Sequence, residues 1–166
     1  MEGAKRQCAR DSIGAHQLTR RELLRGMLAL GGVAKHGAMT AHLIPAVHSN
    51  LHGFPAAGFM LDVGGMRIYV SGDTDLYGDM KMLGERCKPN LGIVCAGDGP
   101  FTMGPEDAAR ACQWMGVAQA IPVHYAHNPL VKGVEAGDDF KRAAAAIAPQ
   151  VNVTVLKPGD TRVIQG

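Results

Sequence analysis

The sequence predicts an α/β fold in which helices pack on a β-sheet, and three observations carry this prediction. Segments 58–63 and 66–71 alternate between apolar and polar residues, and Gly64-Gly65 joins them as in a tight hairpin. After this hairpin, segments with helical spacing alternate with short apolar strands. The length of 166 residues and the 46% of hydrophobic residues suit one globular domain with a buried core.

The first 39 residues differ in residue pattern from the rest, and we expect them to form a separate segment. Thr19 and Glu22 have the spacing of a capping box, which predicts an amphipathic helix. The alternatives are disorder or a twin-arginine export signal, since Arg20-Arg21 precedes the short apolar stretch 26–34. No A-x-A cleavage site follows, so we expect a cytoplasmic protein without a membrane span.

Residues 40–166 are predicted to form the α/β unit itself. The expected strands are 41–47, 58–63, 66–71, 91–96, 120–123 and 151–156, with 161–164 as an added edge. The expected helices are 76–87, 105–115 and 138–148. Pro105 suits the first position of its helix, and Pro89 and Pro149 limit the helices that precede them.

Three of the predicted strands are followed by a side chain that can bind a metal ion. His48, Asp73 and His124 each stand where the chain leaves an apolar strand segment. A rigid strand fixes such a side chain, while the loop beyond it leaves room for a substrate. Imidazole and carboxylate together suit zinc, manganese or iron. Each of the three taken singly is more often an ordinary polar residue, but their recurrence makes them candidate metal ligands.

Several motifs in the region from residue 41 to 159 resemble those of the metallo-β-lactamase superfamily. They are His-Leu-Ile-Pro-Ala-Val-His-Ser at 42–49, Tyr-Val-Ser-Gly-Asp-Thr at 69–74, Phe-Thr-Met-Gly-Pro-Glu-Asp at 101–107, Ile-Pro-Val-His-Tyr at 121–125 and Leu-Lys-Pro-Gly at 156–159. Their order and spacing are similar to those of one branch, the small bacterial metal-dependent hydrolases whose substrates are poorly defined. The run at 101–107 is specific to this branch.

The resemblance implies a four-layer αββα sandwich, of which residues 40–166 would form the C-terminal half, preceded by residues 1–39 as a segment that does not match the family. It also implies a dinuclear site, usually of zinc, in which Asp73 bridges both metals and His48 and His124 each bind one. Asp73 and His124 would thereby take part in catalysis, with a metal-activated hydroxide attacking an ester, lactone, amide or phosphodiester. Asp98 would orient a ligand from outside the site, or would serve as a turn residue.

One family motif is missing from the sequence. The family carries an upstream His-x-His-x-Asp-His string that supplies four ligands, whereas here His16, His36 and His42 are isolated. Each metal would then keep two of its four protein ligands, although zinc sites use three or four. We therefore expect zinc, or another divalent metal, to be sub-stoichiometric or absent.

A single metal ion offers an alternative to the dinuclear site. His48, Asp73 and His124 could gather around one ion, with water in the fourth position. His52 and His127 are nearby substitutes, although histidines in such loops are usually solvated.

Two functional interpretations follow from these motifs. The first is a metal-dependent hydrolase, acting on a small molecule, that is impaired by the missing ligands. The second is a non-catalytic truncated remnant, or a self-associating binding module, that keeps part of the fold. Half of a sandwich would leave an apolar sheet face uncovered, so we expect self-association through that face. The mild net charge of +2 predicts no nucleic-acid partner.

Overall fold

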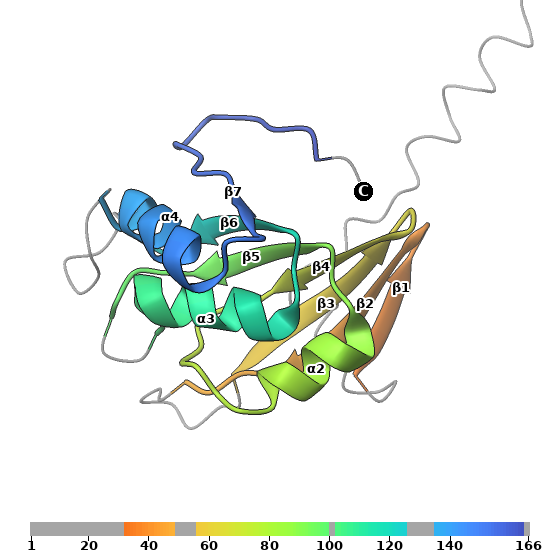
Figure 1. Cartoon of the computed structure of the whole chain (residues 1–166). Helices are drawn as coiled ribbons and strands as arrows, with labels where there is room; N and C mark the ends of the chain where they lie inside the picture. The colour runs from red at the N-terminus through yellow and green to blue at the C-terminus, as the bar shows by residue number, and fades with distance from the viewer. Residues whose placement is uncertain (1–31, 49–55, 100–101, 126–134, 165–166) are drawn as a thin grey trace, which may run out of the picture.

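A mixed β-sheet of seven strands, with three helices on one face, makes up the part of the chain that the structure describes (Figure 1). The structure is a computed structural model that describes residues 32–48, 56–99, 102–125 and 135–164. The strands follow one another across the sheet in chain order. This arrangement confirms the α/β class that the sequence predicts.

The first four strands form an antiparallel meander. They are β1 (Val33–His36), β2 (Met39–Pro45), β3 (Ala57–Val63) and β4 (Met66–Val70). Gly64 and Gly65 both have positive φ in the turn between β3 and β4, as the predicted hairpin requires. Gly37 plays a similar part between β1 and β2, with a φ of 57°.

The second part of the sheet is parallel, with a helix in each connection. Strand β4 is followed by α2 (Met80–Cys87), β5 (Leu91–Cys95), α3 (Pro105–Met115), β6 (Gln119–Val123), α4 (Glu135–Ile147) and β7 (Asn152–Val153). Helix α3 lies between α2 and α4 and contacts both (Figure 1). Parallel strands joined by such crossovers bring all their carboxyl ends to one edge of the sheet.

The main core lies between the sheet and the three helices. Its largest fully buried side chains include Tyr69 of β4, Met80 of α2, Met115 of α3 and Phe140 of α4. Helices α2 and α3 approach closely at Gly84, where an added Cβ would lie 2.4 Å from the Trp114 carbonyl oxygen. Only glycine permits that approach without a shift of the helix.

The opposite face of the sheet also carries apolar side chains. A small cluster around Ala34 and Ala41 includes Leu43, Phe59 and Leu61. The strand register extends this face as one row of partly buried apolar residues across five strands: Leu43, Phe59, Val70, Ile93 and Ile121. Among the described residues, no helix covers this row (Figure 1).

Several boundaries differ from those that the sequence predicts. Strand β1 is unexpected, because four residues are too few to show a clear alternation. The expected strand 151–156 is reduced to β7, which pairs with β6 over two residues only, and 161–164 forms no strand. The expected N-terminal helix and the export signal lie almost wholly in residues 1–31, outside the described part of the chain. No helix among the described residues is long and apolar enough to cross a membrane.

Candidate metal-binding site

The ends of β2, β4 and β6 lie along the same edge of the sheet. Strand β2 is antiparallel to β3, which is antiparallel to β4, so β2 and β4 run in one direction. Strands β4, β5 and β6 are parallel. The sequence predicts that His48, Asp73 and His124 each follow a strand, and the strand directions place all three at the same edge.

Asp73 and His124 come together across the end of β5. The Oδ2 atom of Asp73 lies 3.4 Å from the Nε2 atom of His124, at ion-pair distance. The Asp73 side chain is 51% exposed and that of His124 is 28% exposed, so the pair stands at the surface. A carboxylate and an imidazole in this arrangement are two donors of the type that zinc, manganese and iron accept.

The backbone around this pair adopts left-handed conformations. His124 has a φ of 61° and Asp98, which follows β5, has a φ of 54°. Residues other than glycine avoid this region, and such outliers concentrate at functional sites. Gly72 has a φ of 65°, and an added Cβ would lie 2.9 Å from the Ala57 carbonyl oxygen. The chain therefore needs glycine directly before Asp73.

Two buried hydroxyl groups hold the loop that carries Asp73. The Oγ1 atom of Thr74 accepts a hydrogen bond from the Val47 amide at 2.9 Å, and the Asp75 amide donates to the Val47 carbonyl at 2.7 Å. The Oγ atom of Ser71 accepts a hydrogen bond from the Cys95 amide at 2.9 Å. These bonds fix the segment before His48 beside the loop of Asp73. The sequence shows both hydroxyl residues in a motif but not this role.

Asp98 lies against the start of α3. An added Cβ at Gly104, the residue before the helix, would lie 2.6 Å from the Asp98 Oδ1 atom. The Asp98 amide also donates a hydrogen bond to the Met103 carbonyl at 3.1 Å. These contacts are those of a residue that shapes the turn between β5 and α3.

The described residues do not complete a metal site. Among them, no group of three or more histidine, cysteine, aspartate or glutamate side chains is close enough to hold one ion. His48 therefore does not join Asp73 and His124 as a third donor in this structure. Of the substitutes, His52 and His127 lie outside the described residues, as does His16. Two donors are fewer than the three or four that zinc sites use.

His42 belongs to a different part of the sheet. Its Nε2 atom lies 3.4 Å from the Oδ2 atom of Asp62 on β3, the same separation as in the Asp73–His124 pair. The Arg67 guanidinium contacts the other Asp62 oxygen at 2.9 Å. His42 is thus part of a charged row on β2, β3 and β4.

A mixed sheet with helices on one face, and with histidine and aspartate following its strands, defines an α/β protein of the metallo-β-lactamase type. The sequence-family model of the beta-lactamase superfamily domain matches residues 4–125 of this chain. The chain therefore belongs to this family. The match extends into the segment 1–39.

Two relatives of known sequence are both named as metal-dependent hydrolases. A UPF0173 metal-dependent hydrolase of Archaeoglobus fulgidus is 36% identical over 142 residues, which cover 80% of this chain and 60% of the relative. Another, from Caldivirga maquilingensis, is 35% identical over 81% of this chain and 58% of the relative. The chain thus spans about 60% of the length of these two relatives.

A solved structure with the same fold is Igni18, a metallo hydrolase from Ignicoccus hospitalis. It aligns with a TM-score of 0.71 and 28% identity, over 82% of this chain and 59% of Igni18. The alignment shows that the sheet and helices described above are arranged as in a metallo hydrolase.

Proposed function

We propose that this chain provides the C-terminal ligands of a divalent-metal site in a hydrolase of the metallo-β-lactamase superfamily. The contact between Asp73 and His124 across the end of β5 carries the proposal. The left-handed backbone at His124 supports it, since this conformation costs free energy for any residue with a side chain and such residues cluster at functional sites. Relatives that are named metal-dependent hydrolases support the reaction class.

His48 is the third ligand in this proposal, and it would have to move toward Asp73 and His124 when the metal binds, since the three do not form one group in the structure. The hydrogen bond from Val47 to Thr74 keeps the segment before His48 next to the loop of Asp73. Zinc is the metal we propose, because two imidazoles and a carboxylate are a common zinc donor set. The substrate would be an ester, lactone, amide or phosphodiester, and activity would be impaired because the sequence shows no His-x-His-x-Asp-His string.

Metal binding can be tested directly on the purified protein. We expect titration with zinc to show weak binding of at most one equivalent, and Asp73→Asn and His124→Asn to weaken it at least tenfold. His42→Asn is the matched control, because it removes a histidine that lies 3.4 Å from an aspartate elsewhere on the sheet. Equal loss of zinc in the control and in the site variants would reject these ligands.

Hydrolysis is a separate measurement. Para-nitrophenyl esters and bis-para-nitrophenyl phosphate, tried with and without zinc, report the two main reaction classes. We expect slow turnover that requires zinc and that Asp73→Asn abolishes. Bound zinc without turnover on either substrate would favour the alternative, a non-catalytic protein that keeps part of the fold.

We also propose that a second copy of this chain covers the open face of the sheet. The row of partly buried apolar residues on β2 to β6 supports this interface. A sheet face that is exposed to solvent normally carries polar side chains, so an apolar row indicates a partner.

A further inference from the structure

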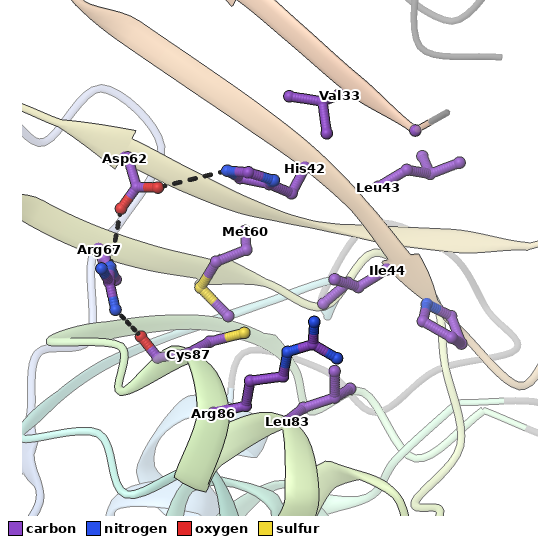
Figure 2. A pocket seen from close by; sticks show the side chains of 12 residues that line it. Val33, His42, Leu43, Ile44, Met60, Asp62, Arg67, Leu83, Arg86 and Cys87 are labelled. Carbon is purple, nitrogen blue, oxygen red and sulfur yellow. Dashed lines mark hydrogen bonds and ion pairs between the residues drawn. The ribbon is translucent and has the colours of Figure 1, made fainter. Parts of the chain in front are cut away.

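A cavity of about 510 Å³ lies between α2 and the antiparallel part of the sheet. Figure 2 shows that it is walled by apolar side chains from β1, β2, β3 and α2, among them Val33, Ile44, Met60 and Leu83. This volume falls within the range of small-molecule binding sites. The cavity extends toward the end of the strands opposite to the Asp73–His124 pair, because His42, Asp62 and Arg67 form one of its walls.

Asp62 is the single carboxylate among the lining residues, and both of its oxygens already face a basic side chain. Asp62 receives the Arg67 Nε–H at 2.9 Å through one oxygen and faces His42 Nε2 at 3.4 Å through the other. Arg67 also donates through Nη1 to the Cys87 carbonyl at 2.6 Å. The contacts of Asp62 and Arg67 are therefore made within this row and to the Cys87 carbonyl, and they hold the Arg67 side chain in place.

Arg86 is different, because its guanidinium makes no hydrogen bond or ion pair within the described part of the chain. It stands in the last turn of α2, and Figure 2 shows its guanidinium extending past Leu83 toward Ile44, both of which line the cavity. A cation near a helix C-terminus gains from the helix dipole in any orientation, so the dipole does not explain this direction. With Asp62 engaged, no lining carboxylate is left to neutralise Arg86.

We propose that this cavity binds a small amphiphilic anion. The guanidinium of Arg86 would take the carboxylate or phosphate head in a bidentate contact, for which arginine geometry is suited. The apolar body would lie against Met60, Ile44 and Leu83. A guanidinium without an ion-pair partner among the described residues, beside an apolar wall, selects a ligand with both features over either inorganic phosphate or a neutral hydrocarbon.

The test uses the whole chain in the presence of a chelator, so that a metal at Asp73 and His124 cannot contribute. Octanoate, octyl phosphate and octanol are titrated in turn by calorimetry or by NMR. We expect one or both anions to bind at one site, at least tenfold more tightly than octanol. The anion that binds more tightly identifies the head group.

Variants on α2 locate the contact. Arg86→Gln should weaken anion binding at least tenfold, and Arg86→Lys should restore part of it, because lysine keeps the positive charge without the bidentate geometry. Arg86 is exposed, so neither substitution should disturb the fold. Lys81→Gln is the matched control, since Lys81 is on the same helix but lies over the Trp114 ring, at 4.5 Å, and outside the cavity. Equal affinity for octanol and the anions in the wild type, absence of any binding, or unchanged binding in Arg86→Gln would overturn the proposal.

Discussion

Thr74 links the two segments that carry His48 and Asp73. Its side chain is fully buried, and its hydroxyl accepts from the Val47 amide while donating to the Asp75 carbonyl. The hydroxyl group therefore makes two hydrogen bonds, one as acceptor and one as donor. A side chain of the same shape without that oxygen would leave two partners in this loop unsatisfied.

We predict that Thr74→Val lowers the free energy of unfolding by about 1–3 kcal/mol, because it removes the partner of a partly buried amide. Urea denaturation measures this change. Thr74→Ser keeps the hydroxyl and should lose clearly less. If the serine and valine variants were equally destabilised, packing of the Thr74 methyl group would be the cause, and the hydrogen bond would not matter.

Asp73 and His124 illustrate how far single residues can be assigned from sequence. Both follow apolar strands, so their placement at one edge of the sheet is predictable from the strand pattern alone. Their contact at 3.4 Å depends on parallel pairing through β5, and the partner of His42 depends on the register of β2 with β3. Registers of this kind are long-range properties, which local patterns do not contain.

The helices show a similar division between local and tertiary causes. Helix α3 begins at Pro105 and ends at Met115, as predicted, because proline at its start and Gly116 at its end are local signals. Helix α2 begins at Met80, four residues later than expected. The helical spacing that predicts the earlier start includes Leu76, but Leu76 packs against the core from the loop before the helix.

Gly84 sets the distance between α2 and α3. We predict that Gly84→Ala destabilises the protein by about 1–3 kcal/mol, since its Cβ would meet the Trp114 carbonyl oxygen at 2.4 Å. Helix propensity alone predicts the opposite, a gain of about 1 kcal/mol. Thermal or urea unfolding decides between them.

Gly78 provides the matched control for that substitution. It precedes the same helix, is exposed, and has nothing within 4 Å of an added Cβ. Gly78→Ala should change stability by less than about 0.5 kcal/mol. Stabilisation by both alanines would mean that α2 can move away from α3 at little cost.

Buried thiol and phenol groups in the core make the stability of the fold sensitive to alkaline pH. Burial raises the pKa of the Cys112 thiol from 9.0 to about 12, and it also raises the pKa values of Cys95 and Tyr69. The folded state therefore holds these protons more tightly than the unfolded chain does. Their contribution is fully present below pH 9 and is lost as the pH rises toward 12.

We predict that the free energy of unfolding falls by up to about 1.4 kcal/mol per pH unit for Cys112 alone between pH 9 and 12. Urea unfolding at a series of pH values measures the slope. Cys112→Ala should give a shallower slope, because it removes one of the groups whose pKa burial raises. A slope unchanged by this substitution would show that Cys112 does not titrate with unfolding.

The two faces of the sheet differ in what covers them, and this difference predicts the state of association. Three helices cover one face, whereas the apolar row that includes Phe59, Ile93 and Ile121 lies on the other. We expect sedimentation to show a dimer at micromolar concentration, and Ile93→Lys to give a monomer because it places a charge in the middle of the row. Met82→Lys adds the same charge on α2, where Met82 is 60% exposed, and should leave the dimer intact. A wild-type monomer, or a dimer that survives Ile93→Lys, would mean that a second copy does not cover this face.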